Sequence, residues 1–314
     1  MKKILVTGAT GQIGSELIPA LRQRYGGENV IAAAHKRPPS KDITESGPCC
    51  YFDVRNADVV QNTVGENQVD TVFHLASILS AKAESNPQLA WDINMNGLLN
   101  VLEAARMNNC SVFFPSSIGA FGPQTPAENT PQDTIQRPNT MYGATKVSGE
   151  LLCDYYHHRF GVDTRGLRYP GLISWKTQPG GGTTDYAVHI FHAALKDGHY
   201  ECFLEPDTRL DMMYMSDAIN AAIELMNADS QQLIHRNAFN VTAMSFAPDD
   251  IAEEIKKHVP GFTISYDIDP ARQAIAESWP RHMDDSAARQ EWHWQPEYDL
   301  PVLVKDMIEK LRAI

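Results

Sequence analysis

The chain alternates short apolar runs with longer amphipathic stretches. Apolar runs rich in β-forming residues predict strands at residues 3–7, 29–34, 50–54, 70–77, 111–117, 166–170 and 239–241. Continuous apolar runs of this length are typical of strands buried on both faces of a parallel sheet. Residues 89–107 place apolar side chains at a helical period. Alternating strands and helices predict an α/β fold with a doubly wound parallel sheet of the Rossmann type.

The second half of the chain predicts more helix than strand. Further helices are expected at residues 185–196, 218–226, 248–258 and 300–311. Trp279, Trp292 and Trp294 suggest a compact aromatic lobe. We find no repeat or independent linker between the halves. We therefore predict two parts, residues 1–171 and a smaller lobe of residues 172–314 that is partly interleaved with the first.

Composition and net charge argue against several classes of protein. The 314 residues are 43% hydrophobic and 21% charged, which is ordinary for a globular enzyme. A net charge of −12 argues against nucleic-acid and anionic-membrane partners. No apolar run approaches the roughly 18 residues of a membrane span, and the N-terminus lacks the apolar region of a signal peptide. The five cysteines suggest free thiols, so we expect a cytoplasmic protein.

A glycine-rich turn follows the first predicted strand. Gly8, Gly11 and Gly14 separate residues 3–7 from a helix that Gln12 and Ile13 lead into. Gly8 permits a tight turn, Gly11 lets backbone N–H groups approach a pyrophosphate, and Gly14 lets the helix pack closely on the strand. A strand, glycines and a helix in this order predict dinucleotide binding by residues 1–171.

The second strand ends differently from a typical NAD site. An acidic residue there normally accepts the ribose hydroxyls of NAD, but this strand ends in Ala34. His35, Lys36 and Arg37 follow. They leave two interpretations open, a site for the 2′-phosphate of NADP or a solvated loop.

Three further positions have both a structural and a functional interpretation. Asp53 ends the third predicted strand and either accepts from the adenine amino group or is a solvated acid. Small residues end the fourth strand, where a cofactor crosses the strand tips, and we interpret His74 there as structural. Asn94 interrupts the apolar helix face. It is either a tolerated polar residue or an amide that holds the backbone or a water beside the active site.

A hydroxyl, a phenol and an ammonium are spaced for alcohol chemistry. Tyr142 and Lys146 are four apart, so they share one face of a predicted helix. A lysine there is expected to stabilise phenolate and lower the tyrosine pKa toward the range of a general base. Ser116 and Ser117 end the fifth strand, and a Pro- and Gly-rich loop joins them to the helix. We predict that Ser117, Tyr142 and Lys146 are catalytic and that Ser116 assists.

A glycine loop in the second half is a candidate for closing over the substrate. Residues 180–182 are three glycines, and Thr183 follows with a hydroxyl suited to a carboxylate or an amine. The alternative is a plain surface linker. His189 and His192 share a helix face, but no acid or cysteine joins them at a metal-binding spacing, so we expect no metal.

Taken together, these motifs resemble the extended short-chain dehydrogenase/reductase superfamily, which includes nucleotide-sugar epimerases. The matching pieces are residues 7–14, Asp53-Val54, His74-Leu75-Ala76, Asn94 with Gly97, Ser116-Ser117, Tyr142 with Lys146, and Arg168-Tyr169-Pro170-Gly171. The resemblance implies cofactor contacts from Gly8, Gly11, Gln12, Ile13, Gly14, Asp53, Val54, Leu75, Ala76, Asn94, Tyr142, Lys146 and Tyr169.

The second half is similar to the L-threonine 3-dehydrogenases of the short-chain type. The similarity rests on residues 170–175, Pro179 with residues 180–187, residues 209–216, and Ser278-Trp279-Pro280. It implies oxidation of the threonine β-hydroxyl with NAD to 2-amino-3-oxobutyrate. Candidate substrate contacts are Ser80, Ser117, Tyr142, Thr183 and Trp279. The departure at Ala34 leaves NADP open as the cofactor.

Two other functions use the same features. A nucleotide-sugar epimerase or dehydratase has the same catalytic residues but needs a larger pocket, and it usually recycles its cofactor in place. A non-enzymatic dinucleotide sensor would not need Ser117, Tyr142 and Lys146 together. Relatives often pair through the helices that correspond to residues 89–107 and 142–159, so the sequence is compatible with a homodimer and with a monomer.

Overall fold

The computed structural model describes residues 1–178 and 180–313, so Pro179 and Ile314 lie outside the described residues. The chain forms two compact units, each assembled from separate segments. The first unit contains residues 1–120, 139–168 and 219–239. The second contains residues 121–138, 169–218 and 240–314. The predicted assignment of residues 172–314 to substrate binding stays a prediction.

The central sheet has seven strands in the order β10-β6-β5-β4-β1-β2-β3. Its strands are β1 (Ile4–Thr7), β2 (Val30–Ala34), β3 (Cys49–Tyr51), β4 (Thr71–His74), β5 (Ser111–Ser117), β6 (Thr164–Tyr169) and β10 (Phe239–Asn240). β1 pairs in parallel with β2 and β4, β2 with β3, and β4 with β5. The chain winds outward from β1 in both directions, which confirms the predicted Rossmann-type α/β fold.

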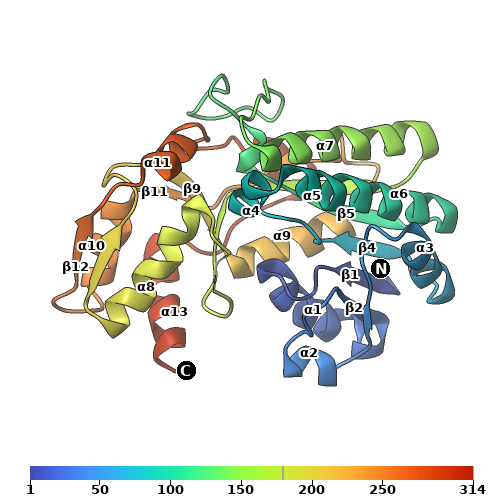
Figure 1. Ribbon diagram of the computed structural model, residues 1–314, viewed down its shortest axis with the longest axis horizontal. Coiled ribbons are helices and arrows are strands. Elements are labelled where there is room, and N and C mark those ends of the chain that lie inside the picture. Colours follow the sequence, from blue (N-terminus) through green and yellow to red (C-terminus); the bar gives the residue numbers. More distant parts are fainter. Residues whose placement is uncertain (179, 314) are drawn as a thin grey trace. The chain divides into compact units, whose positions relative to one another are not determined.

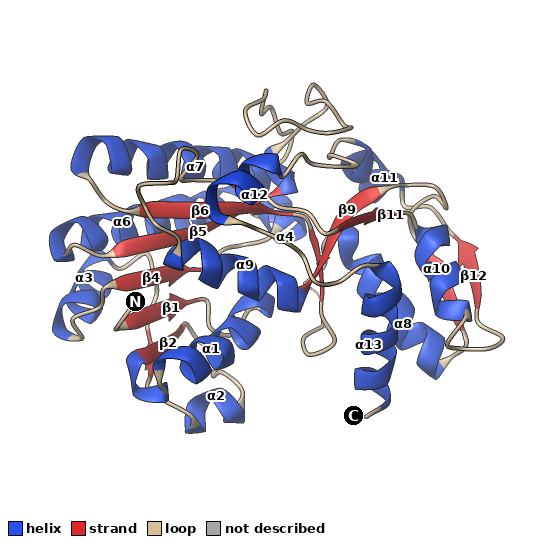
Figure 2. Ribbon diagram, turned by 180° about the vertical axis from the view of Figure 1, so that it is seen from behind, coloured by secondary structure: helices blue, strands red, loops and turns tan. Residues whose placement is uncertain are grey.

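Helices cover both faces of this sheet (Figures 1 and 2). One face carries α1 (Gln12–Tyr25), α2 (Lys41–Glu45) and α9 (Met215–Asn227), and the other carries α3 (Ala57–Glu66), α6 (Gly97–Asn108) and α7 (Met141–Phe160). Apolar side chains of the strands and of the second helix layer form one core, with Leu5, Val72, Val112, Val101 and Leu102 fully buried. The short elements are η1 (Gly27–Asn29), α4 (Ser80–Ser85), α5 (Pro87–Trp91), η2 (Asp92–Asn96) and η3 (Ile118–Ala120).

The helix expected over 89–107 is confirmed as a continuous helical region of α5, η2 and α6, but the π-helical turn η2 within it was not predicted. Two predicted strand ends were wrong, because strand pairing sets them. β3 ends at Tyr51 because its partner β2 ends opposite it at Ala34. β4 ends at His74, opposite the last residue of β1, where the glycine turn begins. The Phe52 N–H still donates to the carbonyl of Ala34, the last residue of β2, at 3.0 Å. Past β4, the Ala76 N–H donates to the Thr7 side chain instead of to a strand carbonyl.

The second unit has two small sheets. One has the order β11-β9-β7 and consists of β7 (Gly171–Ile173), β9 (Leu210–Tyr214) and β11 (Met244–Phe246). The other pairs β8 (His199–Cys202) with β12 (Thr263–Tyr266). Helical elements are η4 (Thr183–Asp185), α8 (Tyr186–Lys196), α10 (Pro248–Lys256), α11 (Pro270–Glu277), α12 (Ser286–Trp292) and α13 (Leu300–Arg312). Trp292 and Trp294 are buried with ring centroids 5.7 Å apart, which is a packing role.

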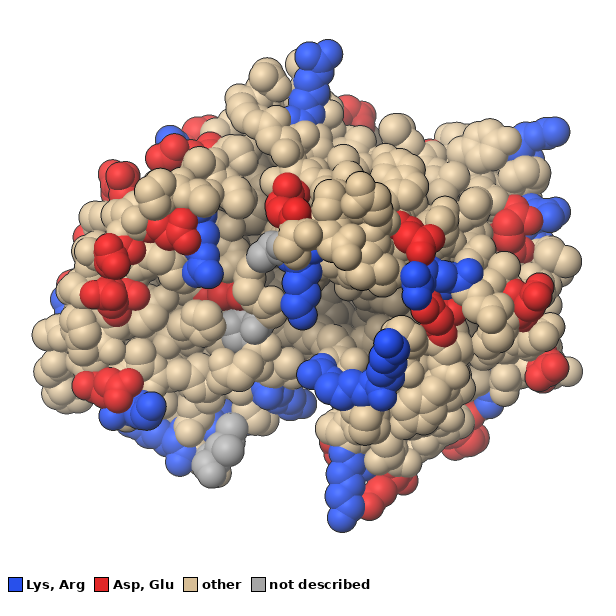
Figure 3. All heavy atoms as spheres, viewed as in Figure 1, with Lys and Arg blue, Asp and Glu red and all other residues tan. Residues whose placement is uncertain are grey.

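The surface carries charges of both signs. Figure 3 shows acidic and basic side chains interspersed over the face drawn, without a continuous basic area. Such a surface agrees with the net charge of −12. Among the described helices, none is both long enough and apolar enough to cross a membrane.

Candidate active site

The glycine turn between β1 and α1 has no room for side chains. Gly8 adopts a φ of +71°, and a Cβ there would lie 2.7 Å from the carbonyl carbon of Leu75. A Cβ on Gly14 would lie 2.4 Å from the Gly8 carbonyl oxygen. Gly11 is the N-cap residue before α1 and has no side chain, so it offers no side-chain acceptor to the first N–H groups of the helix. The turn thus places donors at a helix N-terminus, as predicted from the glycine spacing.

Helix α7 begins immediately before the candidate catalytic tyrosine. The Thr140 hydroxyl caps the helix by accepting from the Gly143 N–H at 3.0 Å. Tyr142 therefore lies in the first turn and Lys146 one turn later. The Lys146 ammonium lies 5.3 Å from the centroid of the Tyr142 ring. The predicted helix face thus carries both groups.

Strand β5 brings Ser117 to the same place. β5 ends at Ser117, and the Cβ position of Gly119 lies 3.6 Å from the Ser117 Oγ and 3.2 Å from the Tyr142 ring, so the two side chains are neighbours. The Gly119 N–H donates to the Ser117 Oγ at 3.1 Å, which fixes the hydroxyl. A Cβ at Gly119 would lie 3.2 Å from the Tyr142 ring, so the turn after β5 packs against the phenol. The structure brings Ser117, Tyr142 and Lys146 together.

The pKa of Tyr142 shifts in the direction opposite to the one predicted. Burial raises the Tyr142 pKa to about 12, and the hydrogen bond with Ser117 opposes the rise. Burial also lowers the pKa of Lys146 to about 8, while Glu150 opposes that shift. The Lys146 ammonium donates to the Pro115 carbonyl oxygen at 2.6 Å. In the chain by itself, desolvation of the phenol therefore outweighs stabilisation of phenolate by the lysine.

Ser116 points into a buried polar network behind the strand end. Its hydroxyl donates to Glu150, whose carboxylate also accepts from the Arg168 guanidinium at 2.9 Å. Ser116, Glu150 and Arg168 are 3%, 4% and 7% exposed. The predicted assisting role of Ser116 stays a prediction, with its hydroxyl bonded to Glu150. Glu150 carried no prediction, although its position four residues after Lys146 was available as a signal.

Asn94 lies in the π-helical turn η2 and points into the fold. Its Oδ1 accepts from the Ile78 N–H at 2.8 Å, and its Nδ2 donates to the Ile78 carbonyl at 3.1 Å and to the Thr145 Oγ1 at 3.1 Å. The Thr145 hydroxyl in turn donates to the Tyr142 carbonyl at 2.8 Å. The amide thus holds the loop after β4 and joins it to α7. Thr145 was missed by the sequence analysis, since a helical threonine gives no distinctive signal.

His74 has a structural environment beside this network. Its Nδ1 is hydrogen-bonded to the Thr7 hydroxyl at 3.0 Å, and the Ala76 N–H donates to the same hydroxyl at 3.3 Å. The ring is 2% exposed, and burial lowers its pKa from 6.5 to about 3. A cavity of about 10 Å³ lies between His74, Ala76, Asn94 and Lys146.

Beyond the ends of β2 and β3, ion pairs join Arg55 to Asp53 and Asp92. The Arg55 guanidinium contacts the Asp53 carboxylate at 2.6 Å and the Asp92 carboxylate at 2.9 Å. This contact is the main reason that the Asp53 pKa falls to about 2. Val54 is buried, and a Cβ on Gly97 would lie 2.8 Å from its side chain, so α6 packs tightly there. Contacts of Asp53 and Val54 with adenine stay predictions.

The predicted substrate residues are divided between the two units. Ser80 begins α4 in the first unit. Thr183, in η4, and Trp279 belong to the second unit and are 4% and 9% exposed. Their joint role in binding a substrate stays a prediction. Tyr169, a predicted cofactor contact, is buried, and its hydroxyl donates to the Ala218 carbonyl at 2.8 Å.

The glycine loop before Thr183 is held by one carboxylate. The Asp185 Oδ2 accepts from the Gly181 N–H at 2.8 Å and from the Gly182 N–H at 2.5 Å. Burial raises the Asp185 pKa, and these two bonds oppose the rise. The loop is therefore anchored to the start of α8. Pro179, the first residue of the predicted loop motif, lies outside the described residues.

The comparisons with known proteins agree with this geometry. The sequence profile described as the NAD dependent epimerase/dehydratase family matches residues 4–241. A relative from Staphylococcus aureus, described as an uncharacterized epimerase/dehydratase, is 53% identical over 311 residues, which are 99% of this chain and 97% of that protein. The chain belongs to the NAD dependent epimerase/dehydratase family. It is therefore a member of an enzyme family whose cofactor is a nicotinamide dinucleotide.

Solved structures within the family are similar over the whole chain. The X-ray structure of an L-threonine dehydrogenase from Clostridium difficile is 56% identical with a TM-score of 0.97, covering 100% of this chain and 98% of that one. The holo form of an L-threonine dehydrogenase from Cupriavidus necator is 50% identical with a TM-score of 0.95, covering 98% of this chain and 99% of that one. The resemblance predicted from the sequence is confirmed.

The residues at the glycine turn fit the family's cofactor. A Cβ added to Gly8 or Gly14 would lie 2.7 or 2.4 Å from the chain's own backbone, so only glycine fits at these positions. In dinucleotide-binding folds, glycines here allow the tight turn and the close packing of helix on strand. The side-chain nitrogen of Gln12, in the first turn of α1, is buried and has no hydrogen-bond partner among the described residues. A buried donor without a partner is costly unless a ligand satisfies it.

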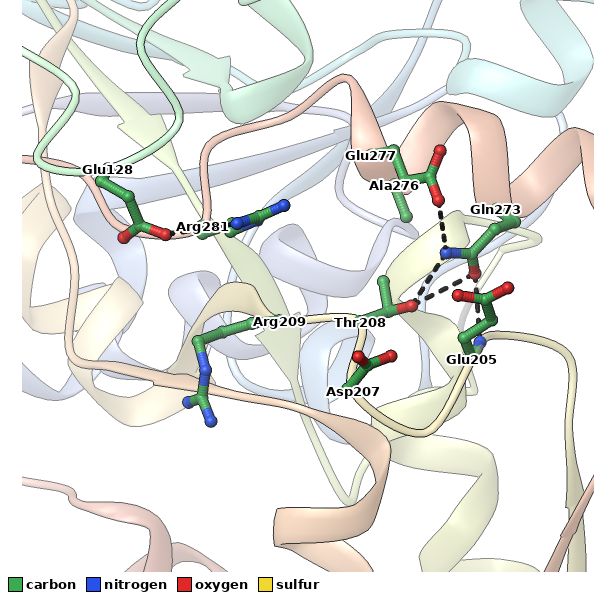
Figure 4. A pocket seen from close by; sticks show the side chains of 9 residues that line it. All are labelled: Glu128, Glu205, Asp207, Thr208, Arg209, Gln273, Ala276, Glu277 and Arg281. Carbon is green, nitrogen blue, oxygen red and sulfur yellow. Dashed lines mark hydrogen bonds and ion pairs between the residues drawn. The ribbon is translucent and has the colours of Figure 1, made fainter.

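A larger cavity lies within the second unit (Figure 4). Its volume is about 310 Å³, and its lining includes Glu205, Asp207, Arg209, Glu277 and Arg281. Gln273 bonds to Thr208 and Glu277 at its wall. Neither Thr183 nor Trp279 is among its lining residues, so the predicted substrate contacts do not point to this cavity.

Proposed function

We propose that the chain oxidises the β-hydroxyl of L-threonine with a nicotinamide dinucleotide to give 2-amino-3-oxobutyrate. The observation that carries the proposal is that Ser117 and Tyr142 lie together against Gly119, with the Lys146 ammonium 5.3 Å from the centroid of the phenol ring. The glycine turn lies in the same unit. Identity of 50% or more with two L-threonine dehydrogenases over nearly the full length supports the choice of substrate.

Three side chains carry the proton chemistry. As phenolate, Tyr142 accepts the proton of the β-hydroxyl next to Ser117. Its own proton must first leave to solvent, a loss that burial opposes in the chain by itself and that the Lys146 charge favours. The Ser117 hydroxyl donates to the reacting oxygen and stabilises it as it becomes a carbonyl. A bound nicotinamide dinucleotide would supply the hydride acceptor for the carbon that bears this hydroxyl. Lys146 remains an ammonium below about pH 8 and favours the phenolate by its charge.

The supporting residues keep this arrangement in place. The Pro115 carbonyl orients the Lys146 ammonium, and Thr145 joins the start of α7 to Asn94. Ser80, Thr183 and Trp279 are the proposed contacts of the amino-acid head group. The Thr183 hydroxyl suits a carboxylate or an amine, and the Trp279 ring suits exclusion of water.

The deciding experiment measures formation of reduced nicotinamide by absorbance. The purified chain is mixed with L-threonine and either NAD or NADP, and UDP-glucose replaces threonine in a parallel reaction. Steady accumulation with threonine supports the proposal. Conversion of UDP-glucose to another sugar nucleotide without accumulation identifies a sugar-nucleotide epimerase. Dinucleotide binding without turnover of any alcohol identifies a sensor.

The cytoplasmic location expected from the free thiols stays a prediction, as does the oligomeric state. One similar solved structure, 47% identical to this chain, is that of a monomeric L-threonine 3-dehydrogenase. Gel filtration with light scattering on the full chain decides between a monomer and a homodimer.

A further inference from the structure

The end of strand β2 lies directly beside the glycine turn. Thr7, the last residue of β1, pairs with Ala33, and the Ala9 N–H donates to the Ala33 carbonyl at 3.1 Å. The chain then leaves the sheet after Ala34. In this fold the residues at this place contact the adenosine ribose of a bound dinucleotide. The side chains that follow Ala34 therefore decide whether the ribose carries a free hydroxyl or a phosphate.

No carboxylate is available from this segment to accept a ribose hydroxyl. Ala34 ends β2 with a methyl side chain that is 4% exposed. Residues 29–41 contain neither aspartate nor glutamate. An acid at this place serves NAD in two ways, because it accepts from the 2′-hydroxyl and repels a 2′-phosphate. Neither effect is available from residues 29–41.

Basic side chains follow the end of β2, where an NAD site normally has an acid. His35, Lys36 and Arg37 follow Ala34 and are all exposed. The Arg37 Nη2 donates to the Thr10 carbonyl oxygen at 2.6 Å, which fixes the guanidinium against the glycine turn. Within the part of the chain that the structure describes, no other hydrogen bond of Arg37 is found. A fixed guanidinium with unused N–H donors suits a phosphate, which it binds at low entropic cost.

The nearest acid does not oppose an anion here. His35 Nε2 lies 3.5 Å from the Asp53 carboxylate. That carboxylate also accepts from the Arg55 Nε and Nη2 at 3.0 and 2.6 Å. Its charge is therefore balanced mainly by the Arg55 guanidinium rather than facing the ribose alone. Lys36 adds a further positive charge and has no ion-pair partner among the described residues.

We propose that this ribose subsite binds a 2′-phosphate through Arg37 and Lys36, so that the chain prefers NADP to NAD. The proposal rests on the dinucleotide site of the proposed function and specifies which dinucleotide it takes. It differs from the NAD dependence that the family resemblance implies. The substitution of the expected acid by Ala34 removes the discrimination against phosphate, and the fixed guanidinium supplies the attraction.

Isothermal titration calorimetry of the full chain with NADPH and NADH tests the proposal without any threonine. We expect NADPH to bind at least about tenfold more tightly than NADH. Arg37→Gln should weaken NADPH binding by about tenfold or more and change NADH binding less than about twofold. Lys41→Gln is the matched control, since Lys41 is exposed and its one ion pair among the described residues is with Glu45. It should leave both affinities unchanged.

A second variant and a fragment probe keep the outcome decisive. Ala34→Asp should reverse the preference toward NADH. The fragment 2′,5′-ADP should compete with NADPH at least about tenfold better than 5′-ADP does. Equal affinities for NADPH and NADH, with Arg37→Gln affecting both alike, would overturn the proposal and identify the segment as a solvated loop. An NADPH preference without oxidation of threonine would support the phosphate subsite and refute the proposed function. Oxidation of threonine with NAD and no NADPH preference would support the proposed function and refute the phosphate subsite.

Discussion

At the scale of single residues, the chemistry depends on how much burial costs each ionised group. Burial raises the Tyr142 pKa to about 12 and lowers the Lys146 pKa to about 8. Burial thus disfavours the charged form of both groups, the phenolate and the ammonium. The sequence predicted that the two groups share a helix face but not the sign of the tyrosine shift, because the degree of desolvation depends on residues far away in the chain.

Replacing the phenol tests its role as the general base. We expect Tyr142→Phe to reduce kcat by at least about a hundredfold, because phenylalanine has no oxygen to accept the hydroxyl proton, while dinucleotide affinity changes less than about twofold. Tyr155→Phe is the control, since Tyr155 lies on the same helix and its side chain is exposed. Initial rates and calorimetry measure both effects. A kcat for Tyr142→Phe near that of the control would remove the phenolate from the mechanism.

Replacing Glu150 tests its effect on the pKa of Lys146. Glu150 raises the Lys146 pKa against the effect of burial. Glu150→Gln should lower that pKa, so the ammonium is lost at a lower pH and the alkaline limb of the kcat/KM profile moves to lower pH. Stability should fall as well, because Arg168 keeps a buried charge without its partner. Glu103→Gln is a control, because Glu103 pairs with Arg106 on the surface. An unmoved profile in a folded Glu150→Gln protein contradicts the prediction.

The lowered pKa of the buried His74 leads to a prediction of how the free energy of unfolding depends on pH. Its folded pKa of about 3 lies below the ordinary 6.5, so only the unfolded chain binds this proton between those values. Stability from this group is complete above pH 6.5 and declines as the pH falls, by about 1.4 kcal/mol per pH unit. Urea unfolding at pH 6.5 and 5 measures the slope. His74→Asn should flatten it, and an identical slope in both proteins would show that another group is responsible.

At the scale of elements, the sequence predicted helix α7 and the helical region before it, but not the π-helical turn within that region. The start of α7 is encoded locally by the Thr140 cap, and the positions of Tyr142 and Lys146 follow from helical geometry. The region 89–107 has an equally periodic apolar face. Its π-helical turn arises because Asn94 bonds to Ile78 and Thr145, residues that are distant in sequence. Periodicity alone carries no information about such bonds.

The π-helical turn gives a prediction at this scale. Asn94→Ala leaves the Ile78 N–H and carbonyl and the Thr145 hydroxyl without this partner. We expect the free energy of unfolding to fall by about 1–3 kcal/mol and kcat to fall with it, since the loop after β4 and α7 are no longer joined. Asn96→Ala is matched to it, because Asn96 lies in the same turn and its side chain donates to the exposed Asp92. Denaturant unfolding and initial rates compare the two, and equal losses would refute the role of Asn94.

At the scale of the whole molecule, the chain passes between the two units at five points. The crossings follow residues 120, 138, 168, 218 and 239. With so many covalent connections, partial unfolding of one unit restricts the other. We therefore expect one cooperative thermal transition rather than two.

Calorimetry with and without the dinucleotide measures this cooperativity. A dinucleotide at a hundredfold excess over its Kd should stabilise the native state by about 2.7 kcal/mol and move the single transition upward. Nicotinamide alone, which lacks the pyrophosphate, should move it less. Two separate transitions, of which only one responds to the dinucleotide, would show that the units unfold independently.

The sequence by itself determined the alternation of strands and helices in the first unit, the glycine turn, and the positions of Ser117, Tyr142 and Lys146 on their elements. These features depend on local backbone geometry, so spacing and residue type are sufficient to predict them. Only the tertiary structure decided the buried network of Ser116, Glu150 and Arg168, the bonds of Asn94, and the sign of the Tyr142 pKa shift. Those depend on desolvation and on partners many residues away, and a linear pattern records neither.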